Sequence, residues 1–164
     1  MRGFALFVAG LGSGILLMQS VVAQSGAQND TSMKLNHVAI TVKNFDEEVA
    51  YYTKSMGFRE AFSFREPNGA PILTYLQISR DTFLEIQPVS AGHPAGFSHI
   101  GIEMIDAKAT IARLRRMGVK VSDVTPSARS GALLTDVFDP EGIYTELLEF
   151  GPTSAQRKAM TAWK

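Results

Sequence analysis

The stretch FSHIGIEM, residues 97–104, decides the fold because it repeats an earlier stretch, LNHVAITV at residues 35–42. Each stretch alternates apolar and other residues and carries one histidine, His99 in the later copy and His37 in the earlier one. Alternation with a period of two predicts a β-strand, in which each histidine shares a face with the residues two positions away. The two stretches therefore predict equivalent strands of a repeated unit.

A glutamate follows each histidine at nearly the same distance along the chain. Glu85 lies 48 positions after His37, and Glu146 lies 47 positions after His99. The two histidines are 62 positions apart and the two glutamates 61, and a predicted helix stop recurs at the same spacing. A near-constant offset of three separate features indicates an internal duplication. We therefore expect one βαβββ unit to occur twice.

The pattern divides the chain into six segments. They are a signal peptide (1–23), a flexible linker (24–33), a first βαβββ module (34–88), an inter-module linker (89–96), a second βαβββ module (97–150) and a C-terminal tail with a short helix (151–164). An α+β fold is expected, in which the modules pair into a curved mixed sheet that forms a cup. Pairing within one chain and swapping with a second chain both remain open, so a homodimer is one of the two assemblies.

Local signals place the elements of each module. Asn44 and Glu47 form a capping-box pattern at the start of the first helix, and Asp106 is a suitable cap for the second. The segment VKVSDV, residues 119–124, predicts a strand after the second helix.

The first residues have the pattern of a secretory signal. Arg2 supplies a positive charge, residues 4–18 are nearly all apolar, and small residues end at Ala23. This run is shorter than the roughly 20 residues that span a bilayer, so cleavage is favoured over a retained anchor. We expect an exported protein, periplasmic or secreted, that begins near Gln24 and has no stable membrane insertion after cleavage.

Composition narrows the chemistry. The 16 basic and 16 acidic residues give no net charge, so no basic field indicates nucleic acid as a partner. The absence of cysteine excludes disulfides, thiolate metal sites and a cysteine nucleophile.

The two histidines and two glutamates are expected to share the face of the sheet that does not pack on helices. Two imidazoles and two carboxylates are costly to bury unless they are paired or bound to metal. The set His37, Glu85, His99 and Glu146 therefore predicts a site for one divalent metal, and nitrogen and oxygen ligands suit Zn, Ni, Co, Mn or Fe(II). His93, in the inter-module linker, is expected to have no such role.

Further side chains of these strands are candidates for a substrate pocket. They are Phe83, Gln87, Phe97, Tyr144 and Leu148. Taken singly, each aromatic residue here is also a normal core residue.

These residues resemble the vicinal oxygen chelate superfamily, which includes glyoxalase I, methylmalonyl-CoA epimerase, extradiol dioxygenases and bleomycin resistance proteins. The resemblance covers residues 35–150, and its most specific pieces are PAGFSHIGI (94–102), the DPEG turn (139–142) and TELLEF (145–150). It implies that the four histidines and glutamates are metal ligands and that Glu146 is a catalytic base, with Glu85 as its symmetric counterpart. It also implies an enediolate-type intermediate next to a substrate carbonyl.

The chain departs from glyoxalase I where that enzyme binds glutathione. Thr41 and Ala95 stand where an arginine would be expected, and Val89 stands where an asparagine would be expected. Loss of these charge-assisted contacts, each worth roughly 1.5–3 kcal/mol, predicts a small substrate other than a glutathione adduct.

Three function classes remain open. The first is a metal-dependent isomerase or lyase that acts next to a carbonyl of a small, fairly apolar substrate. The second is an Fe(II)-dependent ring-cleavage dioxygenase that uses His37, His99 and Glu146, although a fourth ligand leaves less room for O2 and substrate. The third is a binding protein of the bleomycin-resistance type that sequesters a compound without turnover.

Overall fold

The structure, a computed structural model, describes residues 32–164. The elements in chain order are β1 (Met33–Val42), α1 (Phe45–Ala50), the π-helical turn η2 (Tyr51–Ser55), β2 (Arg59–Arg65), β3 (Pro71–Ser79), β4 (Thr82–Pro88), β5 (Gly96–Met104), α2 (Ala107–Arg116), β6 (Thr125–Pro126), β7 (Leu133–Phe138), β8 (Tyr144–Glu149) and α3 (Ala155–Thr161). The predicted signal peptide and most of the predicted flexible linker lie outside the described residues.

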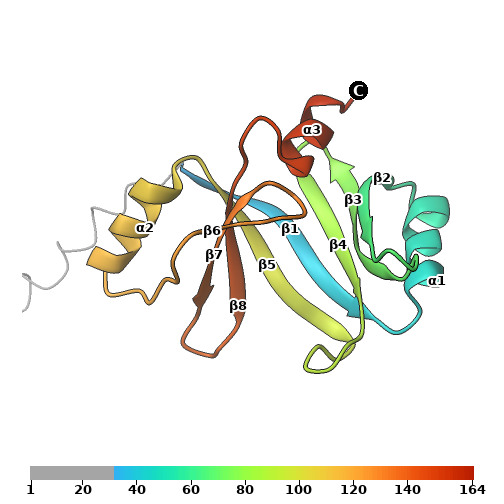
Figure 1. Cartoon of the computed structure of the whole chain (residues 1–164), viewed down its shortest axis with the longest axis horizontal. Coiled ribbons are helices and arrows are strands. Elements are labelled where there is room, and N and C mark those ends of the chain that lie inside the picture. Colours follow the sequence, from blue (N-terminus) through green and yellow to red (C-terminus); the bar gives the residue numbers. More distant parts are fainter. Residues whose placement is uncertain (1–31) are drawn as a thin grey trace, which may run out of the picture. The chain divides into compact units, whose positions relative to one another are not determined.

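All the strands form one mixed sheet, in the order β2-β3-β4-β1-β5-β8-β7-β6. The first strands of the two modules, β1 and β5, pair antiparallel at the centre, and each pairs parallel with the last strand of its own module. The two halves of this order correspond strand for strand, so the expected α+β fold of two βαβββ units in one mixed sheet is confirmed (Figure 1). A single chain supplies both halves.

Two helices cover the outer face of the sheet, one for each module (Figure 1). Phe45 of α1 packs with Leu84 and Ile86 of β4, and Ile111 of α2 packs with Leu147 of β8. These strand residues alternate with the two glutamates, so burial of the apolar face turns both carboxylates toward the inner face.

The C-terminal helix α3 packs on the inner face instead. Its Ala159 and Met160 are in one buried cluster with Tyr75, Phe83 and Leu148 of the sheet. Ser154 caps this helix by accepting a hydrogen bond from the Arg157 amide, at 3.3 Å. The predicted short helix in the tail is therefore present, and it closes one end of the inner face.

Two local predictions are wrong. Residues 119–124 form no strand and make only a single bridge, from Val121 to Val137. The Arg115 side chain donates to the carbonyls of Val121 and Ser122, so these acceptors are turned away from ladder pairing. The other error is the capping box.

The Asn44 side chain does not cap α1. Its amide nitrogen donates to the carboxylate of Glu47 at 3.1 Å, so the two side chains bond each other rather than the helix amides. Asp106, by contrast, caps α2 as predicted, because its carboxylate accepts from the Ala109 amide at 2.8 Å.

Between residues 32 and 164, none of the helices has the length and apolar character needed to cross a membrane.

Candidate metal centre

Four adjoining strands at the centre of the sheet carry the four predicted ligands, His37 on β1, Glu85 on β4, His99 on β5 and Glu146 on β8. One ligand atom from each residue lies within 4.8 Å of the other three. The structure thus brings together in one chain the whole set that the sequence predicts.

The separations between these atoms fit a single metal ion. His37 Nε2 lies 3.1 Å from His99 Nε2, 3.4 Å from Glu85 Oε2 and 3.6 Å from Glu146 Oε2. His99 Nε2 lies 3.9 Å from each of the two carboxylate oxygens. Ligands at about 2.1 Å from a metal are about 3.4 Å apart in a tetrahedral site and about 3.0 Å apart when adjacent in an octahedral one. The four residues therefore fit a divalent metal.

Burial controls the protonation of the site. It lowers the pKa of His37 to about 3, helped by the nearby His99, and it lowers the pKa of His99 to about 4 against the opposing effect of Asp136. Both imidazoles are therefore neutral at pH 7, which is the form that binds metals. Burial also raises the pKa of Glu85, and it raises the pKa of Glu146 to about 8, with the charges of Glu85 and Asp136 adding to the rise. A divalent cation would supply the positive charge that two buried carboxylates need.

The histidine ring nitrogens that face away from the site are also bonded. Nδ1 of His37 lies 3.0 Å from Oδ1 of Asn36, and Nδ1 of His99 lies 3.1 Å from the hydroxyl of Ser98. An amide oxygen can only accept, so His37 carries its proton on Nδ1 and its Nε2 lone pair faces the other three ligands. This second contact orients the imidazole for metal binding.

The two carboxylates have different surroundings. Glu85 is bonded by Tyr75 and by the Gln87 amide, and the side chain is almost fully buried. Glu146 is more exposed and faces Asp136 across the β7–β8 pair. The Asp136 carboxylate accepts a hydrogen bond of 2.8 Å from the Tyr144 hydroxyl. Glu85 is therefore held in place, whereas Glu146 is next to a like charge.

Three of the ligands, Glu85, His99 and Glu146, line an inner cavity of about 620 Å3, a size that accommodates a small molecule. Gln87, Tyr144 and Leu148 line it, as predicted. Phe83 and Phe97 do not. Phe83 shares the ligand face of β4, whereas a bulge at Ser98 pairs Phe97 with Ile40, which is on the helix-packing face of β1. Phe83 is at the end covered by α3 and belongs to the core, and Phe97 is at the opposite end and is 55% exposed.

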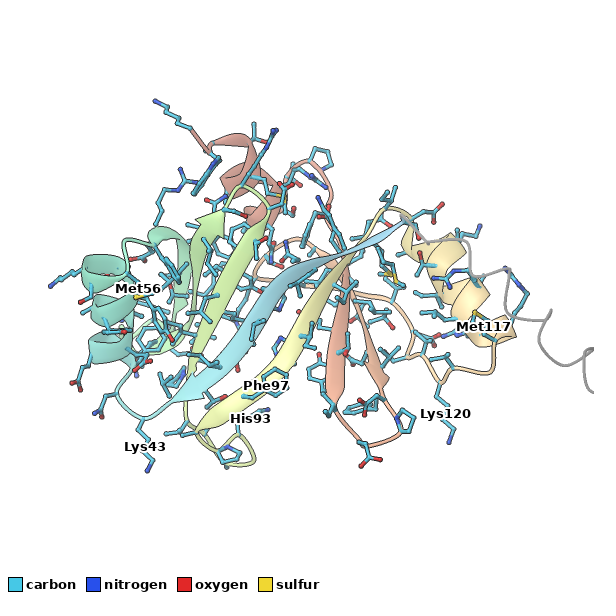
Figure 2. The ribbon with its side chains drawn as sticks, turned by 180° about the vertical axis from the view of Figure 1, so that it is seen from behind. Lys43, Met56, His93, Phe97, Met117 and Lys120 are labelled. Atoms are coloured by element: carbon cyan, nitrogen blue, oxygen red, sulfur yellow. The ribbon has the colours of Figure 1, made fainter. Side chains whose placement is uncertain are left out.

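His93 also lines this cavity, but it is not one of the four residues whose ligand atoms converge. Figure 2 shows His93 and Phe97 at the same end of the sheet, where β4 connects to β5. The Ser90 hydroxyl lies 3.2 Å from Nδ1 of His93, which fixes the turn that carries it.

The polar residues at the site that sequence reasoning missed include Tyr75, Arg129, Asp136 and Gln156. Tyr75 and Asp136 could have been identified from the repeat, because they are 61 positions apart, as the two glutamates are. In the sheet, Tyr75 pairs with Glu85 and Asp136 pairs with Glu146. Arg129 and Gln156 lie outside the repeated strands, and only the three-dimensional placement of the β6–β7 loop and α3 reveals them.

Comparison with solved structures shows the same fold. A methylmalonyl-CoA epimerase in complex with methylmalonyl-CoA and NH4+ is 20% identical, with a TM-score of 0.63 over 76% of this chain and 99% of that chain. The epimerase from Mycobacterium tuberculosis is 17% identical, with a TM-score of 0.60 over 72% and 88%. A hypothetical protein from Bacillus halodurans C-125 is 22% identical, with a TM-score of 0.61 over 73% and 96%. At these identities the likeness extends to the fold alone.

No curated protein sequence matches the chain. Residues 34–147, which include all four predicted ligands, match the sequence profile of the Glyoxalase/Bleomycin resistance protein/Dioxygenase superfamily. The chain belongs to this superfamily.

Proposed function

We propose that this protein is a metal-dependent enzyme that moves a proton at the carbon next to a carbonyl group of a small substrate, as an isomerase or lyase. One observation carries the proposal: four ligand atoms converge within 4.8 Å, and only one of the two carboxylates is held by neighbouring donors. A metal site with only a structural role does not require that one carboxylate be held by donors and the other not.

His37, His99, Glu85 and Glu146 would hold the metal, and Zn, Ni, Co, Mn and Fe(II) all accept this ligand set. When bound, such a metal acts as a Lewis acid that polarises a carbonyl and so acidifies the adjacent C–H bond. The inner cavity gives a small substrate access to these residues.

Glu146 is the base in this proposal. Its carboxylate takes the proton from the carbon next to the carbonyl while the C–H electron pair moves into the carbonyl system. The same carboxyl group then returns the proton to the substrate. In the metal-free protein, burial and the neighbouring carboxylates raise the pKa of Glu146 to about 8, so the surroundings of this carboxylate favour acceptance of a proton. Asp136 contributes by raising that pKa through its charge.

Glu85 has a holding role. Tyr75 and Gln87 donate to its carboxylate, and both bonds keep that group in one orientation beside His37. Two carboxylates related by the duplication thus acquire different tasks, because the side chains across the sheet from them differ, Tyr75 in one half and Asp136 in the other.

Metal analysis tests the first half of the proposal. Purified protein should contain about one divalent metal per chain. The variant His99→Ala should lose it while circular dichroism shows an unchanged fold. An unchanged metal content in that variant would contradict the metal site.

Deuterium exchange tests the second half. The metal-loaded protein in D2O should incorporate deuterium next to the carbonyl of one member of a panel of small hydroxyketones, ketoacids and acyl esters, as read by mass spectrometry. Glu146→Gln should abolish this exchange and retain more metal than His99→Ala. Consumption of O2 with an aromatic diol, in place of exchange, would support the dioxygenase class instead.

We also propose that the substrate is not a glutathione adduct and that the protein is exported. Thr41, Val89 and Ala95 do not line the cavity, and they supply no cation to a tripeptide dianion. The export proposal rests on the pattern of residues 1–23, and it is contradicted if intact-mass analysis of protein from an exporting host finds those residues retained.

A further inference from the structure

A polar wall borders the cavity on the side of the β6–β7 loop and α3. Ser127, Arg129, Ser130 and Gln156 form it, and none of the four belongs to the predicted ligand set. The wall is continuous across the two segments, because the Ser130 carbonyl accepts a 2.8 Å hydrogen bond from the Ala155 amide at the start of α3.

Arg129 is the only permanently charged cation among the described residues that line the cavity. Across residues 32–164, no carboxylate or carbonyl pairs with its guanidinium, in contrast with Arg157, which bonds Glu103 at 2.7 Å. An arginine fork without a partner, on the wall of a cavity, is suited to a planar anion such as a carboxylate.

The loop that carries Arg129 is well defined. The Ser127 hydroxyl accepts from the Ser130 amide at 3.1 Å, and the Ser127 amide donates to the Ala132 carbonyl at 2.8 Å. These bonds fix the backbone on both sides of Arg129, so less conformational entropy is lost when the arginine binds a ligand.

Gln156 provides an independent indication of a ligand. Its side chain is 2% exposed and lines the cavity, yet Oε1 has no hydrogen-bond partner within residues 32–164. The same amide bonds Tyr75, which in turn bonds Glu85, so Gln156 is linked to the metal ligands. A buried acceptor without a donor is costly, and a hydroxyl or N–H group of a bound ligand would satisfy it.

We propose that Arg129 and Gln156 determine substrate specificity, and that they select a small carbonyl compound that also carries a carboxylate and a hydroxyl group. Its carboxylate would bind Arg129, its hydroxyl would donate to Oε1 of Gln156, and its carbonyl end would face the four metal ligands. This inference rests on the proposed function, since it places the carbonyl end of the substrate at the metal.

Three metal-chelating probes of similar size test it by direct binding. They are butyrohydroxamate, which is neutral, the monohydroxamate of succinate, which adds a carboxylate, and the monohydroxamate of malate, which adds a hydroxyl as well. Each is titrated into Co2+-loaded protein and followed by the visible absorption of the ion. The carboxylate should tighten binding about tenfold or more, and the hydroxyl should tighten it further by about threefold or more.

Variants assign each gain to its residue. Arg129→Gln should remove the gain from the carboxylate and leave butyrohydroxamate binding unchanged, whereas Arg129→Lys should restore part of the gain. Gln156→Met should remove only the gain from the hydroxyl. Lys158→Gln is the matched control, because this exposed lysine of α3 does not line the cavity and its loss should change nothing.

The outcomes separate the two proposals. Equal binding of all three probes to the unaltered protein overturns the specificity role and leaves the metal site standing. An equal loss for every probe in Arg129→Gln also overturns it, because that result indicates a structural role. Failure of all three probes to perturb the bound Co2+ overturns the proposed function, and this inference with it.

Discussion

The imidazole of His37 lies directly over Gly101, its partner across the β1–β5 pair. A β-carbon on Gly101 would lie 1.9 Å from Cε1 of His37 and 2.2 Å from Nδ1. The same strand pair places His99 opposite Ala39, so each histidine of the duplication faces a small residue of the other module. The space above Gly101 is therefore what allows His37 to reach the other ligands.

Gly101→Ala should weaken metal binding and leave the fold unchanged. The glycine is in a strand, and its φ is not among the positive values, so alanine fits the backbone and only the clash with His37 opposes it. We expect metal affinity to fall at least about tenfold, in the range seen when a ligand's support is lost. Competition with a chromophoric chelator measures the affinity, and circular dichroism measures the fold.

Gly151→Ala is the matched control for that experiment. A β-carbon there would contact no other atom within 4 Å, and its φ is not positive either. Retention of full metal affinity by Gly101→Ala would show that the His37 ring moves freely, against the geometry described above.

Asn36 should matter for metal affinity although it is not a ligand. It is fully buried, its Oδ1 accepts from Nδ1 of His37, and its Nδ2 donates to the Asp81 carbonyl at 3.2 Å. Asn36→Ala frees the imidazole to rotate and to change tautomer, so we expect metal affinity to fall about 10–100-fold. Asn36→Asp keeps an acceptor at that position and should retain more affinity than Asn36→Ala, as judged by isothermal titration calorimetry. If the two variants bind metal equally, the contact does not orient His37.

The duplication explains why so much of this site was readable from sequence. A strand period of two, applied twice, places His37 and His99 on one face, and the common offset assigns Glu85 and Glu146 to the neighbouring strands. The period of two gives the face of the strand on which a side chain lies, but it does not say how far along the strand that side chain is. Phe83 is on the ligand face yet lies beneath α3, and a bulge at Ser98 turns Phe97 to the opposite face, where it pairs with Ile40.

What could not be predicted depends on contacts between segments distant in sequence. The loop of Arg129 meets the cavity because Ser130 bonds α3, and no local pattern encodes that contact. The failed strand at 119–124 has a similar cause. Its β-propensity is ordinary, but the Arg115 guanidinium takes the carbonyl groups that a neighbouring strand would have used.

The attachment of α3 to the sheet should depend on Arg157. This residue bonds Glu103 at 2.7 Å, and Glu103 is only 5% exposed on the inner face, with Lys34 as its second partner at 3.2 Å. Arg157→Met removes the charge and keeps the aliphatic contacts, so it leaves a buried carboxylate short of a donor. We expect a loss of about 1–3 kcal/mol in the free energy of unfolding, measured with urea.

A second substitution separates charge from packing in that experiment. Adding Glu103→Gln to Arg157→Met should recover part of the stability, since the buried charge is then gone. Arg65→Met removes a surface pair instead, 3.8 Å from Asp46 with both partners exposed, and should cost less than about 1 kcal/mol. Equal losses for the two arginine variants would mean that Glu103 is effectively solvated.

The metal-free protein should lose stability as the pH rises from 6.5 to 8. The pKa of Glu146 is about 8 in the fold and has an ordinary value of 4.5, so the unfolded chain releases this proton at a lower pH than the folded protein does. A rise in pH therefore stabilises the unfolded state relative to the fold. The histidines act in the opposite direction, because their pKa values fall to about 3 and 4 from 6.5, and their contribution is nearly complete about one pH unit above 6.5. Over the whole interval the carboxyl effect is the larger of the two, and the melting temperature should decline, most clearly above about pH 7.5.

Metal should reverse this trend, because binding requires the carboxylate that low pH protonates. Affinity should therefore rise from pH 6.5 to about 8, and the increase in melting temperature on adding metal should be larger at pH 8 than at pH 6.5. Differential scanning fluorimetry with and without Zn2+ at the two pH values measures both effects. Glu146→Gln has no proton to lose there, so its metal-free melting temperature should decline less over this interval than that of the unaltered protein, and Glu85, whose pKa burial also raises, accounts for any remaining decline. An equal decline in Glu146→Gln would assign the titration to another group and would contradict the raised pKa of Glu146.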